Sequence, residues 1–447
     1  MMSRVFTKSN SFYFFILSAL SIGLYSYIGY GIQRHEHLTL GLCFLGLFTG
    51  YYLLLKHNFK TSYVISLGLI SRIIFLCATP TLSQDFYRFL WDGRLIIEGI
   101  NPFLWTPNEI IGLNKIEGPS MEKLWGGMSA LSQSNYSNYP PLHQLPALIA
   151  GLLFKQSMTL SVLFLRGTII FADIGILILG QKLLKLLQLQ PKSIFLYFLN
   201  PLVIVELSGN LHHEGLMIFL LVCFLYFLER KKILWAGFFM GLSVLTKLIP
   251  LFLLPLFLFK LNWRRSWLFY TTIAIVIIIG FTPFFNELFV TNYSKTIGLW
   301  FSNFEFNAGI FYIAKAYCDA YYGVNLMLYM RYIVPIVLSL FLIYFLSKKE
   351  TSTQKILSQT LLLLTVYFLI STTVHPWYII TLIFLSILTQ YSYPILWSFT
   401  IIFSYFSYHN GYVLENDYWR FTQYGMVLII FFYEIIAQKK IKSSSTD

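Results

Sequence analysis

The chain alternates long apolar runs with short polar and basic connections. The runs are about 15–25 residues long, near the length that crosses a ~30 Å hydrocarbon core as an α-helix. The short segments of alternating polarity that build membrane β-barrels are absent from this pattern. It therefore predicts an all-α, polytopic membrane protein of about 13–14 transmembrane helices joined by large external loops.

The basic residues gather in the connections, and such clusters mark the cytoplasmic loops of membrane proteins. Placing them inside puts both termini in the cytoplasm. Leu142 to Phe154 is apolar but short, and a crossing there would invert every later connection, so we interpret it as a dipping or interfacial helix. Trp235 to Phe259 carries Lys247 in its middle, and we divide it into two short spans that meet there. The expected spans are 11–30, 39–55, 62–79, 158–180, 193–209, 214–228, 233–246, 248–260, 267–284, 331–346, 356–374, 376–390, 394–408 and 421–437.

This topology places two long segments outside the membrane, 80–141 and 285–330, and a short one at 409–420. Both long segments are rich in aromatic residues, which favour the membrane interface. The sequence shows no internal repeat and no low-complexity linker. Residues 1–447 are therefore expected to form a single transmembrane domain.

Composition agrees with a membrane protein. Hydrophobic residues make up 57% of the chain and charged residues only 11%, whereas a soluble domain carries roughly 25% charged residues. The net charge of +13 lies in the connections between apolar runs. The expected partner of this charge is the lipid bilayer and not a nucleic acid.

The segment Ser83–Phe103 holds the densest group of charges, with Asp85, Arg88, Asp92 and Arg94 placed among aromatic residues. At helical spacing Asp85, Arg88 and Asp92 share one face. A carboxylate held by arginines at the membrane surface suits a general base that acts on a hydroxyl, and arginines suit a lipid phosphate. An interfacial helix with solvated ion pairs is the alternative interpretation.

This segment resembles the first external loop of the GT-C membrane glycosyltransferases, and most closely that of mannosyltransferases that use a polyprenyl-phosphate sugar. Three further pieces resemble the family in the same order along the chain. The matching strings are Asp85-Phe-Tyr-Arg-Phe-Leu-Trp-Asp-Gly-Arg94, Gly99-Ile-Asn-Pro-Phe103, Asn138-Tyr-Pro-Pro-Leu142, Gly241-Leu-Ser-Val-Leu-Thr-Lys-Leu-Ile-Pro250 and His375-Pro-Trp-Tyr378.

The resemblance implies a GT-C fold, a polyprenyl-phosphate donor of a hexose that is mannose in the family, and an inverting transfer with Asp85 as the catalytic base. A glycolipid or a glycan is the expected acceptor. Family members place this aspartate after the first span, whereas two further spans precede it here. The candidate substrate-binding residues are Arg88, Asp92, Arg94, Tyr139, His212, His213, Glu214, Lys247, His375, Trp377 and Tyr378.

Several of these residues have a second interpretation. His212, His213 and Glu214 stand at the external start of a span, where a helix cap is as consistent with the pattern as a substrate contact. Lys247 either extends toward the interface or binds the donor phosphate. Phe304 to Asn307 either lines an acceptor groove or forms an interfacial amphipathic helix. Histidine and tryptophan at 375 and 377 also serve as interface anchors.

Arg166 and Asp173 lie seven residues apart in one span, and we expect them to pair. The proposed transfer requires no metal, and no compelling ligand set stands out in the sequence.

Two other functions remain open, a transporter or flippase for lipid-linked saccharides and a ligase that acts on them. A transporter predicts related halves and charges around a central cavity, whereas the candidate site residues gather on one side of the membrane. Nucleotide sugars are absent outside the cytoplasm, so an external enzyme needs a lipid-linked donor. We expect an integral membrane protein of a bacterial plasma membrane with its active site facing outside.

Overall fold

The computed structural model describes residues 2–116, 118–154, 157–302, 304–389, 391–410 and 412–444. These residues form helices and no β-strand, and their β-type pairings are two isolated bridges, Phe306 with Thr373 and Tyr408 with Val413. The all-α class predicted from the sequence is therefore confirmed.

Seven helices in the described part of the chain are long and apolar enough to cross a membrane, and a bent pair, Pro191–Phe198 with Pro201–Gly209, makes an eighth. Their outer faces expose large apolar side chains, such as Ile278 at 65% and Ile343 at 64%. Such surfaces suit contact with lipid, and they confirm a polytopic membrane protein. The seven spans lie in α1 (Met2–Tyr30), α2 (His37–Lys56), α9 (Met158–Leu186), α14 (Trp263–Phe281) with η5 (Thr282–Phe284), α17 (Met327–Ser347), α18 (Thr353–Ile370) and α21 (Asp417–Ser444).

The expected number of 13–14 spans exceeds the seven or eight found in the described ranges. Proline lacks an N–H donor and breaks or bends helices, and it interrupts several of the expected spans. The bent pair turns by 55° at Asn200-Pro201. Other expected spans are divided into short pieces, which are η3 (Ile249–Phe252), η4 (Leu254–Phe257), η6 (Pro376–Tyr378), α19 (Ile379–Ile387), α20 (Tyr393–Thr400) and η7 (Ile401–Ser407).

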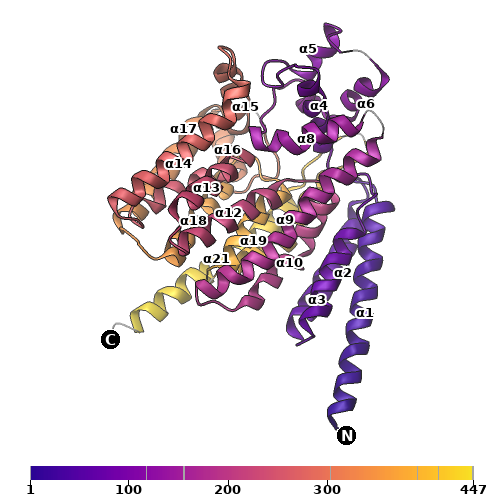
Figure 1. The fold of residues 1–447 in the computed structure, drawn as a ribbon, viewed down its shortest axis with the longest axis vertical. Coiled ribbons are helices and arrows are strands. Elements are labelled where there is room, and N and C mark those ends of the chain that lie inside the picture. The colour runs from indigo at the N-terminus through magenta and orange to yellow at the C-terminus, as the bar shows by residue number, and fades with distance from the viewer. Residues whose placement is uncertain are drawn as a thin grey trace.

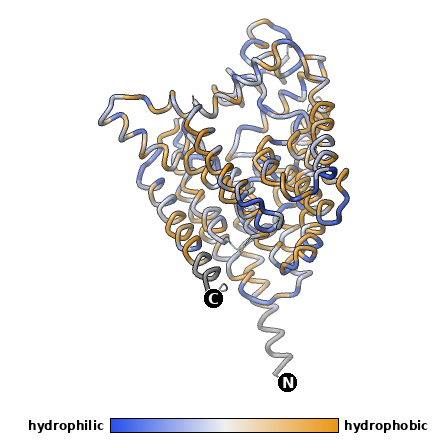
Figure 2. Tube along the Cα trace, turned by 90° about the vertical axis from the view of Figure 1, so that its left-hand side faces the viewer, coloured by the Kyte–Doolittle hydropathy of each residue, from blue (hydrophilic) through white to orange (hydrophobic). Residues whose placement is uncertain are grey.

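The helices form two groups below a set of short helices (Figure 1). Helices α1, α2 and α3 (Thr61–Ile73) pack together at one side. In the larger group, α9 packs on α12 (Glu214–Glu229), α12 on α13 (Ile233–Thr246), and α13 on α14. Figure 2 shows apolar residues along most of these helices. Both chain ends lie on the side away from α4, α5 and α6 (Figure 1).

The segment expected to be external, 80–141, folds into four short helices: α4 (Asp85–Ile97), α5 (Pro107–Gly112), α6 (Pro119–Gly127) and α7 (Ala130–Gln133). It is followed by α8 (Pro141–Phe154), the apolar helix that we did not count as a span. Helix α8 packs on α4, α9 and α13 and so holds α4 against the membrane-spanning group.

Two glycines allow the backbones of α4 and α8 to touch. A Cβ at Gly93 would lie 1.9 Å from the carbonyl oxygen of Ala147, and one at Gly151 would lie 2.8 Å from the backbone of Gly93. Only the absence of a side chain permits this approach. We expect Gly93→Ala to force the two helices apart and to lower stability by at least about 1–3 kcal/mol. Thermal melting in detergent measures the loss, and Gly112→Ala, where a Cβ meets no atom within 4 Å, is the control. Equal melting of both variants would contradict the close packing.

The expected pairing of Arg166 with Asp173 is wrong. Asp173 instead accepts a hydrogen bond of 2.7 Å from Arg72 of α3. Arg166 donates to main-chain carbonyls, including those of Leu76 and Ala78 at 2.8 and 2.7 Å. Both residues lie on one face of α9, but each finds its partner on another segment. Together they attach α9 to α3 and to the chain that leads into Asp85.

Candidate active site

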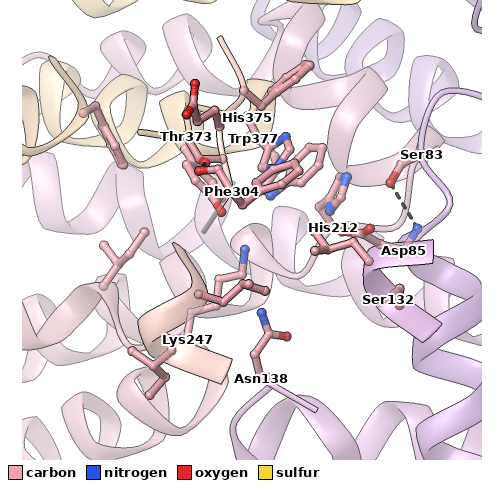
Figure 3. A pocket seen from close by; sticks show the side chains of 18 of the residues that line it. Ser83, Asp85, Ser132, Asn138, His212, Lys247, Phe304, Thr373, His375 and Trp377 are labelled. Carbon is pink, nitrogen blue, oxygen red and sulfur yellow. Dashed lines mark hydrogen bonds between the residues drawn. The ribbon is translucent and has the colours of Figure 1, made fainter. Parts of the chain in front are cut away.

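A cavity of about 1480 Å³ opens where the start of α4, the end of α13 and the residues before α19 meet (Figure 3). Its polar part carries acidic, basic and aromatic side chains from segments far apart in the sequence. Its remaining wall is apolar and is built by η3, η4, α17 and α18. The residues predicted from the sequence that line the cavity are Asp85, Arg88, Tyr139, His212, His213, Lys247, His375, Trp377 and Tyr378.

Asp85 begins α4, and its backbone N–H donates to the hydroxyl of Ser83 at 3.3 Å. A carboxylate is favoured at this helix end because unpaired N–H groups make it positive. Burial raises the pKa of Asp85, while the charges of Lys247 and Arg34 and a hydrogen bond from Tyr139 act in the opposite direction. The side chain is partly exposed and lines the cavity. It is thus a carboxylate placed to accept a proton from a bound group.

Lys247 directly follows the last residue of α13, where the sequence predicts a break from the charge in the middle of this apolar run. Helix α13 stops at Thr246, and Lys247 has extended backbone angles before η3 begins. Its ammonium group forms an ion pair with Glu214 and lies 5.7 Å from the centre of the Tyr378 ring. Lys247 lines the cavity, whereas Glu214 is fully buried behind it. The pair holds a cation at the cavity wall.

Three rings stack in the wall on the other side of the cavity (Figure 3). Trp377 lies between His212 and His375, with centroid distances of 3.7 and 4.4 Å. Burial lowers the pKa of His375 to about 3, with the charges of Arg34 and Lys247 acting in the same direction. The rings are therefore neutral at pH 7 and present an aromatic surface to the cavity.

Residues 304–309 contain no helix, so the interfacial helix considered for Phe304–Asn307 is wrong. This segment pairs through its backbone with the residues before His375, and the N–H of Phe306 donates to the carbonyl of Thr372 at 3.0 Å. Phe304 and Phe306 line the cavity. The second long loop thus contributes to the same site as the first.

The other charged residues of α4 have structural partners. Arg88 donates to Asp92 at 2.7 Å and to two carbonyls of the 132–135 segment. Asp92 is fully buried and also accepts from Ser137 at 2.6 Å. Arg94 pairs with Glu98. Asp92, Arg94 and Glu214 are not among the residues that line the cavity, so the structure does not bring these three predicted residues to its surface.

Two cavity residues were missed at the sequence level. Arg34 stands in the polar turn between α1 and α2, and its guanidinium lies 3.3 Å from the centre of the Tyr408 ring. His143 lies in α8, where its ring is 4.2 Å from that of His213. Both line the cavity. A charge in a short external turn was a visible signal for Arg34, whereas nothing distinguished His143 from an interfacial residue.

Within the described ranges, no group of three or more His, Cys, Asp or Glu residues is placed to hold a metal ion.

Comparison with known proteins identifies the chain's relatives. Residues 33–262, more than half of the chain, match the family described as alpha-(1->6)-mannopyranosyltransferase, N-terminal domain. Two similar proteins are the alpha-(1->6)-mannopyranosyltransferases A and B of Corynebacterium glutamicum. They are 23% and 26% identical, over 44% and 33% of this chain and 39% and 24% of their own.

A third relative is GPI mannosyltransferase 1 of Kluyveromyces lactis, 39% identical over 19% of this chain and 23% of its own. The matches thus span well under half the length of each relative. No solved structure matches the chain. The matched region contains Asp85, Tyr139, His213 and Lys247, and the predicted resemblance to GT-C mannosyltransferases is confirmed. The chain belongs to the alpha-(1->6)-mannopyranosyltransferase family.

Proposed function

We propose that the protein transfers a mannosyl group from a polyprenyl-phosphate donor to a hydroxyl of a glycolipid or glycan acceptor, with inversion at the sugar. The observation that carries this proposal is one cavity lined by a carboxylate, Asp85, and by two cations, Lys247 and Arg34, whose charges both lower the pKa of that carboxyl. Membership of a mannosyltransferase family supports the choice of sugar.

The proposed reaction is a single displacement. The Asp85 carboxylate takes the proton of the acceptor hydroxyl as its oxygen attacks the anomeric carbon from the face opposite the phosphate. The bond between that carbon and the phosphate oxygen breaks, and its electron pair leaves with the polyprenyl phosphate. Arg34 and Lys247 stabilise the negative charge that grows on the departing group.

The apolar part of the cavity supports a lipid-linked donor. Leu251 and Phe252 of η3, Leu338 and Leu342 of α17, and Leu363 of α18 line it. Helix α17 also exposes apolar side chains such as Ile343 on its outer face. An isoprenoid chain placed along this wall would bring its phosphate toward Lys247, which lies two residues before the start of η3.

The cations are tested separately. Arg34→Gln removes a guanidinium whose Nε has no hydrogen-bond partner among the residues described. Lys247→Met alone would leave Glu214 buried and unpaired, so it is combined with Glu214→Gln. Hydrogen bonds to charged groups contribute about 1.5–3 kcal/mol, and each variant is expected to raise the donor KM about 10–100-fold. Arg265→Gln, on the exposed start of α14, is the control. An unchanged donor KM in both site variants would show that the donor phosphate does not bind to Arg34 or Lys247.

Arg34→Gln has a second expected effect, on pH dependence. Asp85 acts as a base only when ionised, so kcat/KM falls as the pH drops through its pKa. Burial raises that pKa and Arg34 lowers it. Loss of Arg34 should therefore move the acidic limb of the profile to higher pH. The Arg265→Gln profile should coincide with that of the wild type.

We further propose that the cavity faces the outside of a bacterial plasma membrane. Tyr412 lies at the cavity edge and is 59% exposed, and Arg230 is exposed in the turn between α12 and α13. In a variant without native cysteines, Tyr412→Cys is expected to react with an impermeant thiol reagent in intact cells, and Arg230→Cys only after permeabilisation. Labelling of Arg230→Cys in intact cells, with Tyr412→Cys labelled only after permeabilisation, would show that the topology is the reverse of the one proposed.

A further inference from the structure

His143 and His213 form a pair of buried rings in the cavity wall. His143 comes from α8 and His213 from the turn before α12, and each residue is 1% exposed. None of their ring nitrogens has a hydrogen-bond partner on another residue of the described chain. Buried polar groups in folded proteins are nearly always hydrogen-bonded. Ring nitrogens that find no partner on any other described residue, at the wall of a cavity, indicate that a bound ligand supplies the missing hydrogen bonds.

The packing of the pair fixes its orientation next to the proposed base. Tyr139 stacks on His143 with a centroid distance of 4.4 Å, and the edge of Phe89 contacts both histidines at 4.7 and 5.3 Å. The Tyr139 side chain also lowers the pKa of Asp85. The two imidazoles are therefore held by apolar contacts beside the residue that would activate the acceptor.

The charge state of the pair selects its ligand. Burial lowers the pKa of His213 to about 3 and that of His143 well below its ordinary value, and the nearby charge of Lys247 acts in the same direction. A neutral imidazole offers one donor and one acceptor. A sugar hydroxyl both donates and accepts, whereas a phosphodiester only accepts. Hydroxyl groups therefore satisfy both nitrogens of each ring, and the phosphate fits Arg34 and Lys247 better.

We propose that His143 and His213 form the subsite for the transferred sugar, bind its ring hydroxyls and determine which pyranosyl group is accepted. This inference rests on the proposed function, since it assigns the sugar of the lipid-linked donor to a particular wall of the cavity. A donor that lacks a hydroxyl bound by the pair leaves a buried nitrogen unpaired, and its affinity falls about 10–100-fold.

Binding measurements on the purified full-length protein test the subsite without requiring transfer. The probes are polyprenyl-phosphate-mannose and bare polyprenyl phosphate. The wild type is expected to bind the sugar-bearing lipid about 10–100-fold more tightly. His143→Phe and His213→Phe keep a ring in the stack but remove the nitrogens, and both should reduce this preference without changing the affinity for the bare lipid. His213→Gln, which retains a donor and an acceptor, should restore part of it. His57→Phe, in the turn between α2 and α3, is the matched control.

Equal loss of affinity for both lipids in the phenylalanine variants would overturn the proposal, because the pair would then act on the phosphate or on the fold. A wild type that does not distinguish the two lipids would overturn it as well. If a variant fails to fold, wild-type binding of donors that lack one hydroxyl at a time decides the question, and equal binding of all of them contradicts the subsite. Sugar-dependent binding without transfer would contradict the proposed function and leave the subsite intact.

Discussion

Replacement of Asp85 by asparagine is expected to lower kcat about 10²–10⁴-fold, the usual contribution of a general base. Asparagine keeps the size of the side chain but cannot accept the proton of the acceptor hydroxyl. The variant should still fold. Because burial raises the pKa of Asp85, ionisation of this group disfavours the folded state, and a neutral replacement removes that penalty.

The variant should also bind the donor, since Arg34 and Lys247 are unchanged. Transfer is measured under single-turnover conditions with saturating donor, and donor binding is measured separately. Near wild-type transfer by Asp85→Asn would show that the base is misassigned. Donor affinity that falls with activity would instead assign Asp85 to donor binding.

The same substitution at Asp92, two turns along α4, should lower the stability of the fold and leave transfer measurable. Asp92 is fully buried and accepts hydrogen bonds from Arg88, Ser137 and Gln144 at 2.7, 2.6 and 3.3 Å. Asp92→Asn leaves the buried guanidinium of Arg88 without a counter-charge, and breaking such a pair costs about 3–5 kcal/mol. We expect a clear fall in melting temperature in detergent and a smaller yield of folded protein.

Asp85→Asn is the matched control for this measurement, because the residue type, the helix and the change are identical. Folded Asp92→Asn protein should retain measurable transfer, since Asp92 does not line the cavity. If Asp92→Asn melts at the wild-type temperature but loses all transfer, then Asp92 has the role that we assign to Asp85.

Local sequence patterns predicted the parts of the site that are carried by a single segment. The Asp85 string predicted helical spacing, which the structure shows as α4, and the charge at Lys247 predicted a break in an apolar run. Helical spacing placed Asp85, Arg88 and Asp92 on one face, and the structure shows Arg88 and Asp92 as an ion pair. Such spacing could not reveal that the pair is buried, or that Asp92 contacts Ser137 and does not line the cavity.

Features that depend on contacts between segments could not be predicted. Arg34 and His143 join the site only because α1–α2 and α8 pack beside it, and a single sequence contains no record of that packing. The failed pairing of Arg166 with Asp173 has the same cause, since Arg72 of another helix competes for the carboxylate. The expected number of spans exceeds the number of long helices for two reasons: Pro201, Pro250 and Pro255 interrupt two of the apolar runs, and α3, α12 and α13 are too short to count among the long helices.

The most direct measurement is the transfer of radiolabelled mannose from polyprenyl-phosphate-mannose to extractable glycolipid or glycan. It is made in membranes that contain equal amounts of the wild-type protein or of Asp85→Asn. Labelled product should form with the wild type and fall about 10²–10⁴-fold with the variant. Equal labelling in the two membranes, or labelling that requires a nucleotide sugar in place of the lipid-linked donor, would contradict a lipid-phosphate-dependent mannosyltransferase with Asp85 as its base.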